Sequence, residues 1–136
     1  MDTARNKEIV RGFFAAMSRG DPKLPELFCD DIGWWVPPEA NLGGLHQGKP
    51  AVLALMASGI GLYDLTTPMR VEIEQLVAEG DWVCAQLVIE ARTARGEPYR
   101  NHYHFAFRLR DGRIALVKEY VDTLYADRKL FRAAAG

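Results

Sequence analysis

The sequence predicts an α+β fold in which N-terminal helices pack on a curved antiparallel sheet and enclose a small apolar pocket. Apolar residues recur at helical spacing in the first part of the chain. From Met69 onward the period becomes two, in four runs over residues 69–78, 82–93, 98–109 and 114–124. This change of period separates a helical layer from a sheet layer.

The composition is that of an ordinary globular domain. The chain has 136 residues, 49% of them hydrophobic and 26% charged, with a formal net charge of -1. We therefore expect one domain over residues 1–136. The small net charge gives no reason to expect binding to nucleic acid or to a membrane surface. No apolar run approaches the roughly 18 residues of a membrane span. A signal-peptide pattern is missing and the two cysteines lie far apart, so the cytoplasm is the expected compartment.

Three helices are expected before the sheet. Asp2 or Thr3 can cap the first, and Gly20 ends it. Asp21-Pro22 opens a second, short helix, because Asp is a good N-cap and Pro suits the first helical position. A third helix follows Lys49-Pro50. The apolar face of the first helix consists of Ile9, Val10, Phe13, Phe14 and Met17.

Shorter segments complete the expected fold. Residues 32–36 form a short strand in which Trp34 and Trp35 point to opposite faces, so only one can face the pocket. Residues 57–68 contain glycines and a proline and are expected to form a flexible lid. A short closing helix is expected from Leu124 onward.

The expected register of the strands follows from the turns between them. A two-residue Asp111-Gly112 turn places Asn101 opposite Asp122, and Tyr103 opposite Tyr120. A two-residue Arg95-Gly96 turn places Glu90 opposite Asn101. The predicted pocket face therefore ends in a polar row of Glu90, Asn101 and Asp122.

This row suggests acid–base chemistry. Two carboxyls in a partly apolar pocket repel each other and lose hydration, so at least one should hold its proton more tightly. Asp122 and Glu90 are the predicted catalytic pair, and Asn101, Tyr103 and Tyr120 would orient a substrate. The alternative is a structural network at the sheet edge, or a solvated Glu90.

The other face of the predicted sheet is partly apolar, which suggests a homodimer through this outer face. It carries Val83, Ala85, Leu87 and Ile89. His102 and His104 also lie here, with His104 opposite Glu119. A His-x-His pair suggests a metal site, but the sequence places no third ligand. A hydrogen bond between His104 and Glu119 is therefore the preferred interpretation, and no metal is predicted.

Several segments resemble the SnoaL-like, ketosteroid-isomerase-related branch of the nuclear transport factor 2-like superfamily. The strongest likeness is the last hairpin, Phe107–Ile114, followed by Lys118–Thr123. The resemblance extends over nearly the whole chain. Further carriers are Ser18–Asp21, Leu27–Asp31 and the Gly48-Lys49 entry to the third helix. It implies a cone-shaped curved sheet wrapped around the helices.

The resemblance also bears on the site. Ketosteroid isomerases place a Tyr donor where Phe14 stands, a general base near Val36, and a second carboxylic donor near Phe105. All three positions are apolar here, which argues against steroid isomerisation. Phe14, Phe105 and Trp34 would instead line the pocket.

Comparison with other branches of the superfamily leaves one expected catalytic residue, Asp122. Limonene-epoxide-hydrolase-like enzymes use an Arg and two Asp, of which the last matches Asp122, while Leu87 and Ile89 occupy the other positions. SnoaL-like cyclases also use an acid close to Asp122. The expected function is a cofactor-independent isomerase, cyclase, dehydratase or epoxide hydrolase acting on a small, mostly apolar metabolite. The alternative is a non-catalytic ligand-binding or dimerisation module.

Overall fold

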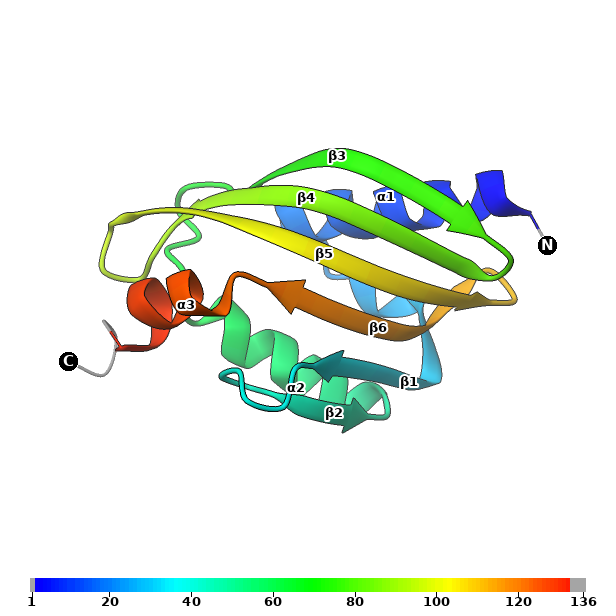
Figure 1. The fold of residues 1–136 in the computed structure, drawn as a ribbon, viewed down its shortest axis with the longest axis horizontal. Helices are drawn as coiled ribbons and strands as arrows, with labels where there is room; N and C mark the ends of the chain where they lie inside the picture. Colours follow the sequence, from blue (N-terminus) through cyan, green and yellow to red (C-terminus); the bar gives the residue numbers. More distant parts are fainter. Residues whose placement is uncertain (1, 133–136) are drawn as a thin grey trace.

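The computed structural model describes residues 2–132 and is an α+β fold with a curved, open, six-stranded sheet (Figure 1). α1 packs against β3 and β4 on one face of the sheet, and α2 packs against β1 and β2. The elements in chain order are α1 (Thr3–Arg19), the 3-10 turn η1 (Leu24–Leu27), β1 (Phe28–Val36), β2 (Gly44–Gln47), α2 (Lys49–Ile60), β3 (Arg70–Glu79), β4 (Trp82–Arg92), β5 (Pro98–Arg110), β6 (Arg113–Val121), α3 (Thr123–Ala126) and the helical turn η2 (Asp127–Arg132). No helix within residues 2–132 is long and apolar enough to cross a membrane.

α1 forms where the sequence predicts it. The Asp2 side chain accepts a hydrogen bond from the Arg5 backbone nitrogen at 2.9 Å, which satisfies one of the free N–H groups of the first turn. Gly20 ends the helix in the left-handed conformation, with φ 63°. Phe13 and Phe14 are buried and make edge-on contacts with Phe107 of β5. This aromatic contact anchors the helix to the sheet.

The strand order is β2-β1-β6-β5-β4-β3. β3 to β6 form the predicted antiparallel meander, and β1 adds to it in parallel with β6. β2 was not predicted, because Gly44 to Gln47 form a short edge strand inside a glycine-rich segment with no apolar run. The short helix predicted at Asp21-Pro22 is reduced to the four residues of η1.

The register predicted between β4 and β5 was wrong by one residue. The loop contains three residues rather than two, because the Thr93 backbone nitrogen donates to the Glu97 carbonyl oxygen at 2.8 Å. Gly96 has φ 82°, the left-handed conformation that such a three-residue hairpin needs. As a result Ile89, and not Glu90, lies opposite Asn101.

A β-bulge also changes the faces of β6. Arg110 pairs with Arg113 as predicted, but Arg108 pairs with Leu116, so Ala115 is an extra residue in the strand. Beyond the bulge, Tyr103 lies opposite Val121 and His104 lies opposite Tyr120. A second irregularity lies between Ile73 and Gln75 of β3.

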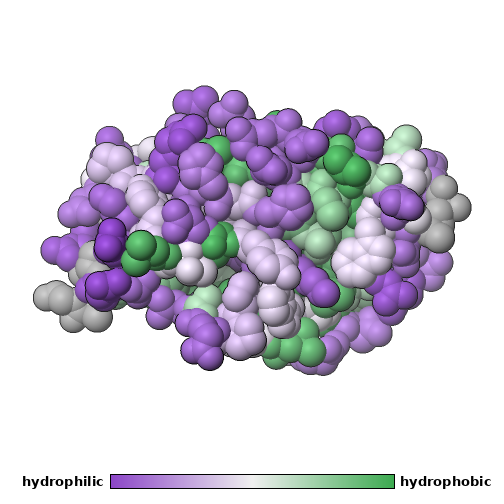
Figure 2. Space-filling model, in the orientation of Figure 1, coloured by the Kyte–Doolittle hydropathy of each residue, from purple (hydrophilic) through white to green (hydrophobic). Residues whose placement is uncertain are grey.

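These shifts exchange the two faces of β4 and of the second half of β6. The buried face of the sheet carries Val83, Ala85, Leu87, Ile89, Tyr99, Asn101, Tyr103, Phe105, Phe107, Leu109, Ile114 and Val117. The four β4 residues on which the homodimer prediction was based therefore face the core. The face seen in Figure 2 is mainly hydrophilic, with hydrophobic residues in small groups. The homodimer stays a prediction.

Candidate functional site

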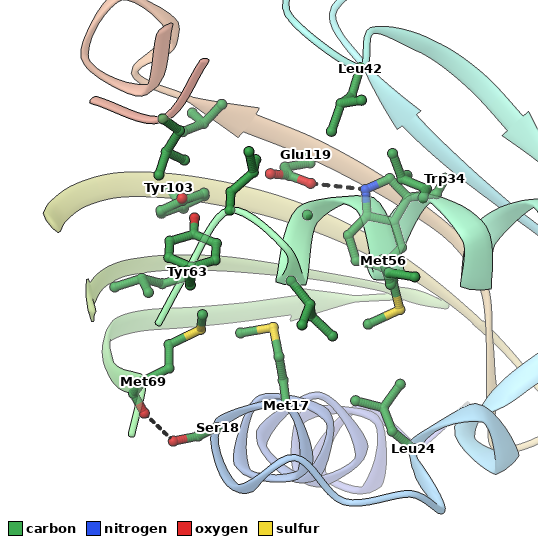
Figure 3. Close-up of a pocket in the computed structure, with 18 of the residues that line it drawn as sticks. Met17, Ser18, Leu24, Trp34, Leu42, Met56, Tyr63, Met69, Tyr103 and Glu119 are labelled. Carbon is green, nitrogen blue, oxygen red and sulfur yellow. Dashed lines mark hydrogen bonds between the residues drawn. The ribbon is translucent and has the colours of Figure 1, made fainter. Parts of the chain in front are cut away.

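A large cavity lies between the inner face of the sheet, the end of α1, α2 and the segment that follows α2. Its volume is about 1040 Å³. Most of its wall is apolar, and Met17, Met56 and Met69 extend into it (Figure 3). Methionine side chains are flexible and polarisable, so they adapt to apolar ligands of different shape. The cavity is therefore suited to a mainly apolar small molecule.

Glu119 places a carboxyl in this apolar wall. It lies on β6 two residues after the inward-facing Val117, and it accepts a hydrogen bond from Trp34 Nε1 at 2.9 Å (Figure 3). Burial raises the pKa of the Glu119 carboxyl, and the hydrogen bond from Trp34 acts in the opposite direction. A carboxyl with a raised pKa exchanges protons more readily near neutral pH than an exposed one does.

Three tyrosines surround the same end of the cavity. The Tyr99 and Tyr103 hydroxyl oxygens, both on β5, lie 2.7 Å apart. Figure 3 shows the Tyr63 hydroxyl pointing toward Tyr103, and the Tyr63 ring centroid lies 5.5 Å from that of Tyr99. Burial raises the pKa of all three phenols above the ordinary value of 10.0, so they stay protonated and can donate hydrogen bonds.

Tyr63 belongs to the segment that was predicted as a flexible lid. Residues 57–60 of that segment belong to α2, and the remainder forms a wall of the cavity that is held at Tyr63 and at Met69, the residue after the segment. Tyr63 forms an isolated bridge with Thr93 in the β4–β5 loop. At the other end, the Ser18 hydroxyl of α1 donates to the Met69 carbonyl oxygen (Figure 3). These contacts hold the Tyr63 hydroxyl at the polar end of the cavity.

The two predicted catalytic carboxyls lie outside the cavity. Asp122 is exposed and caps α3, where its side chain accepts a hydrogen bond from the Tyr125 backbone nitrogen at 3.1 Å. Glu90 faces the outer side of the sheet, where it forms ion pairs with Arg100 at 3.2 Å and Arg70 at 3.7 Å. The predicted polar row is therefore wrong, because the three-residue loop and the bulge turn both carboxyls away from Asn101.

The predicted substrate-binding residues are divided between the cavity, the core and the outer face. Trp34, Tyr103 and Phe105 line the cavity. Phe14 is buried beneath it, with its ring 5.3 Å from that of Phe105. Tyr120 lies on the outer face and contacts Trp35.

Asn101 is buried behind the tyrosines. It does not line the cavity, but its Nδ2 donates to the Tyr99 hydroxyl at 2.9 Å. It therefore reaches the cavity through Tyr99 and Tyr103.

Sequence reasoning missed Glu119 and Tyr63. The regular apolar alternation of Val83, Ala85, Leu87 and Ile89 was the signal that could have corrected the faces of β4, because such a run marks the core face of a strand. It could not have found Glu119, because the bulge at Ala115 decides which residues of β6 face the cavity. For Tyr63, we find no signal in the irregular segment around it.

The histidine pair lies away from this site. His102 and His104 are exposed on the outer face, and His104 pairs with Tyr120 rather than with Glu119 as predicted. Within residues 2–132, no group of three or more His, Cys, Asp or Glu side chains is arranged to hold a metal ion.

Comparison with known proteins places this geometry in a family. Residues 10–117 match the model of the SnoaL-like domain family. No curated protein sequence matches the chain significantly. The chain is 30% identical to the crystal structure of a nuclear transport factor 2-like protein from Burkholderia xenovorans, with a TM-score of 0.75 over 96% of this chain and 98% of that one.

Two further solved structures share the fold at lower identity. One is a protein from Bacillus subtilis named as an isomerase, with 22% identity, a TM-score of 0.78 and coverage of 95% of both chains. The other, from Jannaschia, is named as a SnoaL-like polyketide cyclase, with 16% identity, a TM-score of 0.80 and coverage of 94% of this chain and 92% of that one. By its sequence match over residues 10–117, the chain belongs to the SnoaL-like domain family.

Proposed function

We propose that this protein is an enzyme that uses Glu119 for acid–base chemistry on a small, mostly apolar metabolite. The observation that carries the proposal is the Glu119 carboxyl in an apolar cavity wall, held by Trp34 and with its pKa raised by burial. A carboxyl tuned in this way suits a general base or acid. The isomerase and cyclase names of the two structural relatives support a reaction of this class.

Glu119, Tyr103 and Trp34 have different roles in the proposed reaction. The ionised Glu119 takes a proton from a carbon atom next to a polar substituent, and the electron pair of the broken C–H bond moves toward that substituent. Tyr103 donates a hydrogen bond to the substituent and stabilises the developing negative charge. Return of the proton to another carbon completes an isomerisation, and no redox step is needed. Trp34 positions the carboxyl throughout.

The proposal can be tested without knowing the final product. A library of apolar ketones, polyketide-like aromatics and terpenoids is screened by thermal shift, and each ligand found is incubated with the protein in D₂O. Uptake of deuterium into the ligand, followed by mass spectrometry, measures proton transfer at carbon. We expect Glu119→Gln to slow this exchange by about 10²- to 10⁴-fold, the usual contribution of a general base.

Asp122→Asn is the matched control, because it also removes one carboxyl charge but lies outside the cavity. We expect it to exchange at the wild-type rate. Exchange at the wild-type rate in Glu119→Gln would refute the proposal. Ligand binding without exchange in the wild-type protein would instead support the alternative of a non-catalytic binding module.

A further inference from the structure

The Asn101 amide has one possible orientation. Its Oδ1 accepts from the His102 backbone nitrogen at 2.8 Å, and its Nδ2 donates to the Tyr99 hydroxyl at 2.9 Å and to the Asp122 carbonyl oxygen at 3.2 Å. Rotating the amide by 180° would place NH₂ against the His102 N–H and an oxygen against the Asp122 carbonyl. Two donors and two acceptors would then face each other, inside a region where Asn101 is only 1% exposed.

This orientation affects the hydroxyl next to it. The Tyr99 oxygen already accepts a hydrogen bond from Asn101, so its own proton is available for another acceptor. The Tyr103 oxygen lies 2.7 Å away, a distance across which either hydroxyl could donate, and it can be that acceptor. Hydrogen bonds in a chain polarise one another in the same direction, so donation by Asn101 strengthens donation by Tyr99. The proton of Tyr103 then points away from Tyr99, toward the cavity, where the Tyr63 hydroxyl lies and where a ligand oxygen can accept it.

We propose that Asn101 sets the direction of a hydrogen-bond chain, Asn101 to Tyr99 to Tyr103, and thereby makes the cavity select apolar ligands that carry an acceptor oxygen such as a carbonyl. Asn101 is a positioning residue in this scheme, because it acts through two tyrosines. The inference rests on the proposed function only in that both use the same cavity and the same Tyr103 hydroxyl. It names the substituent that the substrate presents beside Glu119.

Two probes of nearly equal shape test the selection. 2-Acetylnaphthalene carries a carbonyl, and 2-ethylnaphthalene replaces it with a methylene group. Binding of each is measured by quenching of tryptophan fluorescence, since Trp34 lines the cavity. We expect the wild-type protein to bind the ketone about tenfold more tightly, the usual worth of one hydrogen bond. Tyr103→Phe should abolish this preference.

Tyr99→Phe tests the direction of the chain through the sign of its effect. The variant keeps the ring contacts with Tyr63 and Tyr125 and removes only the hydroxyl. If Tyr99 donates to Tyr103, its loss weakens the Tyr103 donor, and we expect the preference for the ketone to fall about threefold. If Tyr103 donated to Tyr99, the same change would free the Tyr103 proton and raise the preference.

Asn101→Leu supplies the second variant, with folding checked by circular dichroism. We expect it to lower the preference as Tyr99→Phe does, and the double variant to lose no more than either single one, because both act through one chain. The infrared carbonyl band of the bound ketone should shift to lower frequency in the wild type and less so in both variants. A preference that is unchanged or increased in Tyr99→Phe, or a failure of the wild type to bind the ketone, would overturn the inference. Neither result depends on deuterium exchange, which tests Glu119 separately.

Discussion

Replacing Glu119 by Gln should make the folded protein more stable at neutral pH, and the gain should disappear in acid. Burial raises the pKa of this carboxyl in the folded state above its ordinary value of 4.5. As the pH rises through 4.5, the unfolded chain releases the proton while the folded chain keeps it. The unfolded state then binds fewer protons than the folded state, so the free energy of unfolding falls with rising pH. Glutamine has no proton to release and avoids this loss.

The size of the effect is limited because only one proton is bound or released. A single group can change the free energy of unfolding by at most about 1.4 kcal/mol per pH unit. Glu119 is half-buried and faces an open cavity, so solvent screening reduces the penalty, and we expect a gain of about 1 kcal/mol at pH 7. For a domain of this length, that corresponds to about 4 °C in the midpoint of thermal unfolding. The hydrogen bond from Trp34 can be retained, because the Gln side-chain oxygen is also an acceptor.

The assay is urea unfolding of the wild type and of Glu119→Gln at pH 4, 5, 6, 7 and 8. Glu72→Gln, which removes an exposed carboxyl from β3, controls for the change in net charge. The result to examine is how the difference in free energy of unfolding between the wild type and Glu119→Gln changes with pH. A difference that is the same at every pH would report only the changed hydrogen bond. Parallel curves for wild type and Glu119→Gln would refute the reasoning that burial of this carboxyl is unfavourable.

Two further changes test the cavity and the core. Met56→Trp should place a larger ring in the cavity and weaken binding of any ligand found by thermal shift at least tenfold, as measured by titration, while the far-ultraviolet circular dichroism spectrum stays that of the wild type; unchanged affinity would mean that ligands bind elsewhere. Phe107→Ala should lower the free energy of unfolding by about 3–5 kcal/mol, measured with urea, because Phe107 is fully buried against Phe13 and Phe14. A loss below about 1 kcal/mol would show that this aromatic cluster does not hold α1 on the sheet.

The sequence contained enough information for the helices and long strands but too little for their alignment. Period and capping identify α1 and the meander, because these signals are local to each element. Register depends on whether the β4–β5 loop has two or three residues, and on one extra residue, Ala115, in β6. Arg95, Gly96 and their neighbours are compatible with a loop of either two or three residues, so the packing of the whole strand decides the loop length. A shift of one residue moved Glu90 and Asp122 outside and Glu119 inside.

The bulge at Ala115 shows how the cavity of such a protein could change during evolution. Lys118, Glu119 and Tyr120 follow one another on β6, and only the middle one faces the cavity. An insertion or deletion of a single codon that slipped the strand by one position would present an ammonium and a phenol to the cavity in place of the carboxyl. The residues of β5 and α1 that form most of the core would keep their places. One insertion or deletion can thus change the functional group that a ligand meets, without any amino-acid substitution in β6.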